Sequence, residues 1–185
     1  MIELGYMAKR IIARPDWLNV PTVKDICSVC GCMSMDFCDY TPFWKHNGFW
    51  FFDSPSAIRA VAWEHNVDLI DTALFYFRGY ERQFDADNGK WIDYGPEQGM
   101  RTEIAPPLSA ELLGYDIVTC SMQNAPEHSP LSCNHVAAHV RVNDHCLVDS
   151  LDYAVEQVET GAFSNAEPGP FRIIAVHALP WVDGR

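Results

Sequence analysis

Apolar and polar positions recur with the period of a helix in two stretches of the chain, and each stretch follows an Asp-Ser pair. The first helix is expected over residues 55–65, with Ser54 as its N-cap. The second is expected over residues 151–160, with Ser150 as its N-cap and Gly161 just past its end. A short apolar run precedes each Asp-Ser pair, so the sequence predicts the same strand, cap and helix twice.

The remaining apolar runs predict strands. Residues 72–94 predict a hairpin, because alternating aromatic residues precede an Asn-Gly turn. Residues 22–40 fit either a short helix or an irregular loop, and residues 95–110, rich in Gly and Pro, predict a surface connection. A short helix is expected to begin near Ser129 or Ser132. Further strands are expected at the other apolar runs, which are residues 2–14, 49–52, 115–122, 145–150 and 171–179.

Together these elements predict an α+β fold in a single globular domain over residues 1–185, with a largely antiparallel sheet of about six strands covered by two or three helices. A chain of 185 residues suits one domain with a substantial core. No window reaches the roughly 18 apolar residues that span a bilayer, and the N-terminus lacks the apolar segment of a secretory signal. We therefore expect a cytoplasmic protein without a membrane partner.

Acidic residues dominate the charge. The formal net charge is −12 and the isoelectric point is near 4.8, which disfavours binding to nucleic acid and favours rapid association with a basic partner. Between Glu103 and Pro170 the chain has ten acidic residues and a single base, Arg141, a net −9. This uneven distribution fits either an ordinary solvated surface or a docking face for a partner.

Two acidic regions are the candidate partner-binding sites. The late helix carries Asp152, Glu156 and Glu159 on one side, and no Lys or Arg within that helix offsets them. The hairpin tip and the segment after it carry the others, which are Asp85, Asp87, Asp93 and Glu97. Two acidic regions make a partner surface more plausible than one.

Cysteines suggest a second kind of site. Thiolates in Cys27-Ser-Val-Cys30-Gly-Cys32, with Cys38 nearby, could bind zinc, since C-x-x-C is half of a common structural site. No second matched pair follows, because the later cysteines stand singly, at positions 120, 133 and 146. The seven cysteines, an odd number, also suit free thiols that pack as small apolar residues. We therefore expect no metal and no cofactor.

Cys133 is a candidate nucleophile if it lies near a helix N-terminus, which would favour its thiolate. Its possible base and orienting partners are numerous: His128, His145, His177, Asp149 and Asp152. The flanking Ser132 and Asn134 are equally suited to capping or turns.

His135 and His139 have the i, i+4 spacing of a helical zinc pair. However, Val136 stands where the metalloprotease pattern has its glutamate. The phosphate-binding, dinucleotide-binding and serine-hydrolase motifs are absent from the sequence.

Four strings between Tyr40 and Val176 resemble those of small immunity proteins encoded beside bacterial polymorphic toxins of the Rhs or contact-dependent type. They are WKHNGFWFFDSP, SPLSCN, HCLVDSLDYAVE and EPGPFRIIAVH. The resemblance implies a cytoplasmic, non-enzymatic protein that binds one cognate toxin domain and blocks its active site or substrate access. Such proteins need no cofactor. None of the shared strings is catalytic, so the resemblance assigns no binding residue.

The sequence therefore predicts an immunity protein without enzymatic activity, and its partner is expected to be a basic toxin domain. The alternative is a cysteine- or zinc-dependent hydrolase that uses Cys133 or the Cys27, Cys30 and Cys32 cluster. A constitutive subunit of a larger assembly is a third possibility. The oligomeric state and the activity of the toxin are left open.

Overall fold

A curved antiparallel sheet forms the centre of the computed structural model, which describes residues 1–33, 47–120 and 124–181. Its strands lie in the order β1 (Ile2–Lys9), β4 (Ala73–Asp85), β7 (Phe171–Leu179) and β6 (Glu111–Thr119), and β5 (Lys90–Asp93) pairs with the end of β4. A separate pair joins β2 (Ile12–Ala13) to β3 (Asp25–Ile26). The helices are α1 (Pro55–Glu64), α2 (Pro130–Cys133) and α3 (Leu151–Glu159), with a 3-10 turn over Val136–Ala138.

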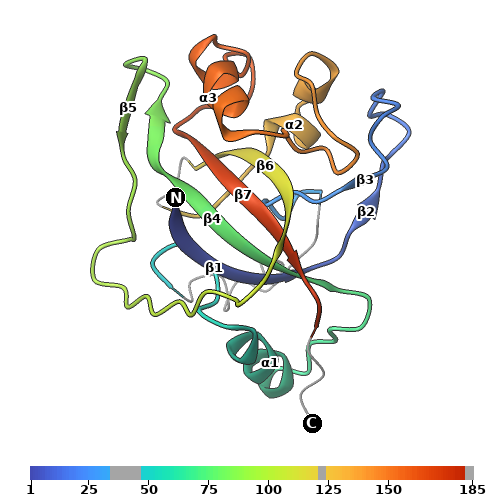
Figure 1. Ribbon diagram of the computed structural model, residues 1–185, viewed down its shortest axis with the longest axis vertical. Coiled ribbons are helices and arrows are strands. Elements are labelled where there is room, and N and C mark those ends of the chain that lie inside the picture. The colour runs from blue at the N-terminus through green and yellow to red at the C-terminus, as the bar shows by residue number, and fades with distance from the viewer. Residues whose placement is uncertain (34–46, 121–123, 182–185) are drawn as a thin grey trace.

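Two clusters of buried apolar side chains pack against this sheet. One contains Phe75 and Phe77 of β4 and Ile58 of α1. The other contains Ile117 of β6 and Ile173 of β7 with side chains of α2, α3 and the β2–β3 segment. Figure 1 shows α2 and α3 at one end of the sheet and α1 at the opposite end. The expected α+β domain with a largely antiparallel sheet is confirmed, and no helix in the described part of the chain is both long and apolar enough to cross a membrane.

The two serine-capped helices are confirmed. The hydroxyl of Ser54 accepts a hydrogen bond from the backbone N–H of Ala57 in α1, and that of Ser150 accepts one from Tyr153 in α3. Each cap satisfies one of the backbone donors that a helix leaves free at its start. The hairpin of β4 and β5 and the strand at residues 171–179 are also confirmed.

Several strand expectations need correction. Residues 2–14 form two strands rather than one, and the strand expected at 115–122 begins at Glu111 and ends at Thr119. Most apolar side chains of the runs at 49–52 and 145–150 are buried, but these runs form no strand beyond single bridges to the sheet. Residues 22–33 form the short strand β3 and a loop, and residues 34–40 lie outside the described part of the chain.

Two asparagines, the buried Asn47 and the partly buried Asn143, explain why those two runs are not strands. The side-chain oxygen of Asn47 accepts hydrogen bonds from the N–H groups of Phe49 and Phe51, at 2.9 and 3.1 Å. In the same way, the side-chain oxygen of Asn143 accepts hydrogen bonds from the N–H groups of His145 and Leu147, at 3.0 and 3.2 Å. These N–H donors are therefore unavailable to a neighbouring strand. The third residue after each asparagine also has a positive φ angle, which is 68° at Trp50 and 61° at Cys146.

The same arrangement extends to the strand that precedes each run. The amide group of Asn47 donates to Leu4 at 3.1 Å, and that of Asn143 donates to Leu113 at 2.7 Å. The next residue in each strand, Gly5 or Gly114, has a positive φ and lies at a β-bulge. A Cβ atom at either glycine would lie within 3 Å of a backbone oxygen of the run that follows the corresponding asparagine. Each of the two runs then leads into an Asp-Ser pair and a helix.

The protein thus contains two equivalent units. One consists of β1, the Asn47 run, α1 and β4, and the other of β6, the Asn143 run, α3 and β7. The sheet order places β4 beside β7 in the centre, with β1 and β6 outside them, so the two units are related by an approximate twofold axis. A connection lies between the first strand and the asparagine of each unit, and it spans residues 10–46 in one and 120–142 in the other.

Candidate functional site: a cysteine cluster and an acidic face

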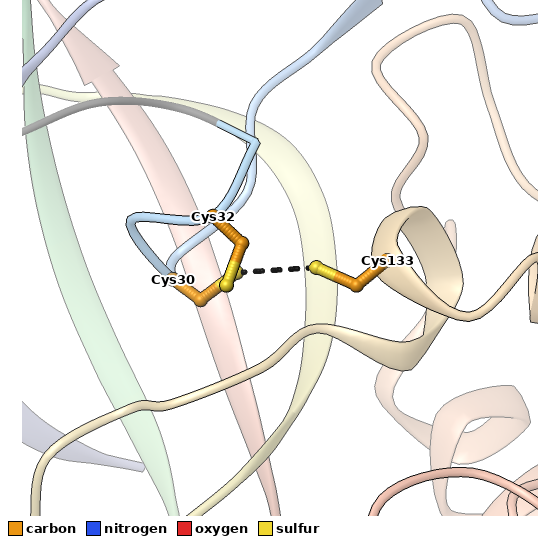
Figure 2. A group of neighbouring side chains, drawn as sticks. All are labelled: Cys30, Cys32 and Cys133. Atoms are coloured by element: carbon orange, nitrogen blue, oxygen red, sulfur yellow. Dashed lines mark hydrogen bonds between the residues drawn. The ribbon is translucent and has the colours of Figure 1, made fainter.

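Three cysteines from these two connections meet beside the sheet. Cys30 and Cys32 lie in the loop after β3, and Cys133 is the last residue of α2. Figure 2 shows their side chains pointing toward one another. The Sγ atoms of Cys30 and Cys133 are 3.7 Å apart, and all three sulfur atoms lie within 4.8 Å of one another.

Asp116, a fully buried residue of β6, holds both parts of this cluster in place. Its carboxylate accepts hydrogen bonds from the backbone N–H of Val29 at 2.8 Å and the hydroxyl of Ser28 at 3.2 Å, in the loop that leads to Cys30. It also accepts one from the hydroxyl of Ser129 at 2.5 Å, at the start of α2. One carboxylate therefore fixes the position of both segments.

A buried lysine binds the carbonyl oxygens of the same loop. Lys9, at the end of β1, is only 1% exposed. Its ammonium donates hydrogen bonds to the carbonyl oxygens of Val29 and Cys30, at 2.7 and 2.9 Å. A buried ammonium needs such partners, because removing its charge from water is costly. Asp116 thus binds hydrogen-bond donors of the loop, and Lys9 binds its acceptors.

The contacts within the cluster change the pKa values of its thiols in opposite directions. Contacts with Cys133 and Cys32 lower the pKa of the Cys30 thiol well below its usual range, and the ammonium of Lys9 lowers it further. The same contact with Cys30 raises the pKa of Cys133. Burial raises the pKa of Asp116 to about 7, and the charge on Cys30 adds to this rise, while the hydrogen bonds from Ser129, Val29 and Ser28 oppose it. Among the three thiols, Cys30 is therefore the one whose deprotonation these contacts favour.

Cys32 connects the cluster to the protein surface. Its side chain is exposed, unlike that of Cys30, which is fully buried. Its thiol lies 3.3 Å from the carbonyl oxygen of Glu127 and 3.4 Å from Nδ1 of His128. An imidazole nitrogen therefore lies at the edge of the cluster, on the connection that carries Cys133.

The C-x-x-C pair considered as half of a zinc site is not brought together. Cys27 belongs instead to the other grouping of potential metal ligands among the described residues, with Asp25 and His145. Its sulfur lies 3.9 Å from Nδ1 of His145 and 3.6 Å from Asp25. His145 and Asp25 already form a hydrogen-bonded pair at 2.7 Å. Burial raises the pKa of Cys27 to about 12. Cys38 lies outside the described residues.

The arrangement expected of a Cys133 nucleophile is absent from the described residues. Cys133 is the last residue of a four-residue helix, so it gains nothing from a helix N-terminus. Its polar contacts run to Cys30, Cys32 and Ser132 instead of a histidine. The proposed partners lie elsewhere: His128 contacts Cys32, His145 pairs with Asp25, His177 is on β7, and Asp149 and Asp152 are exposed beside Ser150.

The pair His135 and His139 also lacks the helix that its spacing required. His135 has a left-handed φ of 59° and precedes the 3-10 turn, which His139 follows. The ring of His135 packs edge-on against Trp17, with the ring centroids 4.8 Å apart. The two imidazoles therefore do not share one face of an α-helix.

The two acidic regions meet at one end of the molecule. The indole N–H of Trp91 in β5 donates a hydrogen bond of 2.8 Å to Glu159 of α3, which places the hairpin beside the helix (Figure 1). Asp87, Asp152 and Glu156 are exposed, and so is Glu159. We call these four residues, together with Asp85, the acidic face.

The other candidate acids differ in their surroundings. Asp85 accepts hydrogen bonds from the backbone and side chain of Asn88 at the hairpin tip, which lower its pKa. Asp93 is exposed and lies opposite Arg82 in the hairpin. Glu97 accepts a hydrogen bond from the indole of Trp50 at 3.0 Å, so it supports the Asn47 run and stands apart from the acidic face.

No family model matches this chain, and neither a curated protein nor a solved structure matches it. The resemblance to immunity proteins therefore stays a prediction.

Sequence reasoning did not identify the grouping of Cys133 with Cys30 and Cys32 or the role of Asp116. Cys30 and Cys133 are 103 residues apart along the chain, so no local spacing connects them. One signal was present, because Asp116 is a charged residue inside an apolar strand, where a buried carboxylate requires several donors.

Proposed function

We propose that this protein is a cytoplasmic immunity protein that binds a cognate bacterial toxin domain and neutralises it by blocking its active site or substrate access. The observation that supports the proposal most directly is the acidic face. Two separately acidic elements, the β4–β5 hairpin tip and α3, are joined on one surface by the contact between Trp91 and Glu159. The four strings that resemble immunity proteins are consistent with it.

The charge of the acidic face suits a basic partner. Asp87, Asp152 and Glu156 are exposed carboxylates, and no salt bridge occupies them among the described residues. With a net charge of −12, the whole protein adds long-range attraction. Such steering raises association rates by about 10-fold or more. Rapid capture matters to a cell that makes its own toxin.

Trp91 adds an apolar element to this surface. It is partly buried against Tyr80 and Phe84 and carries the hydrogen bond to Glu159. Protein interfaces favour aromatic residues at their centres and charged residues around them. We therefore place the centre of the toxin-binding surface between the hairpin and α3, with Asp93 at its margin and Glu97 outside it.

The test uses the toxin domain encoded next to this protein's gene. Reversing three charges on α3, with Asp152→Lys, Glu156→Lys and Glu159→Lys together, should leave the fold intact and weaken toxin binding by roughly 100-fold, since each exposed charge contributes about 1 kcal/mol. Calorimetric titration measures the affinity, and growth of cells that co-express the toxin measures neutralisation.

A charge-matched control separates local contacts from overall charge. It carries Glu64→Lys, Glu103→Lys and Glu111→Lys, which are all exposed positions outside the acidic face. In this variant only the rate constant for association with the toxin should fall, and the fall should be largest at low salt. Equal losses of affinity in both triple variants would remove α3 from the interface, and failure of the wild-type protein to bind or neutralise the toxin domain would refute the proposed function.

A further inference from the structure

The cysteine cluster has the geometry of a metal site. In a tetrahedral zinc site with Zn–S bonds of about 2.3 Å, two sulfur ligands lie roughly 3.8 Å apart. The Sγ atoms of Cys30 and Cys133 are 3.7 Å apart, and the sulfur of Cys32 lies within 4.8 Å of both. A small movement of the exposed Cys32 side chain would complete a three-sulfur arrangement around one ion.

The surroundings of the sulfurs resemble the support that metal ligands usually have. Outer hydrogen bonds commonly fix the segments that carry the ligands. Here Asp116 binds Ser28 and Val29 on one segment and Ser129 on the other, so both backbones are held before any ion arrives. Lys9 places a positive charge against the carbonyl oxygen of Cys30, which favours negative charge on the cluster.

We propose that Cys30, Cys32 and Cys133 bind a zinc ion that joins the loop after β3 to helix α2. The three thiols each release a proton to solvent as they coordinate the ion, and two or three thiolates with nitrogen donors are common zinc ligands. His128, whose Nδ1 lies 3.4 Å from Cys32, offers a nitrogen for the remaining position. Cys32 provides the route of entry, because the other two sulfurs lie deeper.

Such an ion would be structural. The first unit contributes Cys30 and Cys32 through its connection, and the second unit contributes Cys133 through its own, so the ion links the two halves of the protein at a point outside the sheet. A structural ion of this kind stabilises the folded state, because the unfolded chain does not assemble the site. This inference is independent of toxin binding.

The primary experiment measures zinc in protein purified without chelators, by mass spectrometry of the metal. The wild-type protein should contain equimolar zinc, and Cys30→Ser and Cys133→Ser should each abolish it. Cys32→Ser serves as the variant that folds, because this side chain is exposed. It should weaken zinc binding by at least the roughly 10- to 100-fold typical of losing an outer-shell partner.

Two control variants locate the site. Cys27→Ala and Cys146→Ala remove buried thiols outside the cluster and should retain equimolar zinc. Replacing zinc with Co²⁺ should give the intense charge-transfer absorption of cobalt thiolates in the wild-type protein and in these two controls. The Cys32→Ser protein should show a weaker absorption band and should need a higher Co²⁺ concentration to reach half of its maximum.

Three outcomes would overturn the proposal. The first is wild-type protein that neither contains zinc nor takes up Co²⁺. The second is zinc that depends on Cys27 and His145 but not on Cys133, which would assign it to the other group. The third is an intact mass, measured under denaturing and non-reducing conditions, that is lower by two hydrogen atoms, together with a disulfide-linked peptide that contains Cys30 and Cys133.

Discussion

Removing the carboxylate of Asp116 should destabilise the fold more than any exposed acidic substitution. Asp116 is fully buried on β6 and accepts three hydrogen bonds, from Ser28, Val29 and Ser129. In Asp116→Ala each donor loses its acceptor inside the protein. Leaving a buried donor unpaired costs about 1 to 3 kcal/mol, and the hydroxyl of Ser28 can turn toward Cys30, 3.1 Å away. We therefore expect a loss of about 3 to 5 kcal/mol.

Equilibrium unfolding in urea, followed by tryptophan fluorescence, measures this loss. The matched control is Glu111→Gln, an exposed acid on the same strand, which should change the free energy of unfolding by less than about 0.5 kcal/mol. A double-mutant cycle with Ser129→Ala isolates the 2.5 Å hydrogen bond and should give a coupling energy of about 1 to 2 kcal/mol. A loss below about 1 kcal/mol for Asp116→Ala would refute the view that this carboxylate holds both segments.

Three further predictions concern other parts of the protein. Asn47→Ala and Asn143→Ala should destabilise by similar amounts, about 2 to 4 kcal/mol in urea unfolding, because each asparagine satisfies two backbone N–H groups and one carbonyl. Burial and the charge of Arg78 lower the pKa of His177 below its usual value of about 6.5, so the unfolded chain takes up a proton at a higher pH than the folded protein does. Stability should therefore fall as the pH drops below about 6.5. In thermal unfolding, His177→Phe should show a shallower fall between pH 7 and 5. In metal-free protein, alkylation followed by peptide mass spectrometry should modify Cys32 before the other described cysteines, because it alone among them is exposed, and added zinc should slow that reaction.

Local signals in the sequence were sufficient for the helices and the hairpin. Ser54 and Ser150 mark the starts of α1 and α3 correctly, because an N-cap depends on a few adjacent residues. The runs at 49–52 and 145–150 were wrong as strands, although most of their side chains are buried. Apolar composition predicts burial, but Asn47 and Asn143 bind the backbone donors that a strand would have used.

The candidate site depended more on contacts between distant residues. The acidic residues of α3 and the hairpin could be identified separately, and only the fold places Trp91 against Glu159. The C-x-x-C spacing directed attention to Cys27, whereas the sheet and α2 bring Cys133 to Cys30. The spacing of residues in the sequence does not predict the contact between Cys30 and Cys133, because that contact depends on three buried hydrogen bonds to Asp116.

The twofold arrangement of the sheet has a mechanical consequence. The central pair β4 and β7 forms the boundary between two equivalent units, so the middle of the sheet plays the part that an interface plays in a symmetric dimer. Strain applied to one unit reaches the other mainly through this strand pair and through the two connections that meet at Cys30 and Cys133. A toxin that docks across the β4–β5 hairpin tip and α3 would contact both units, so the central strand pair would carry the load that passes between them.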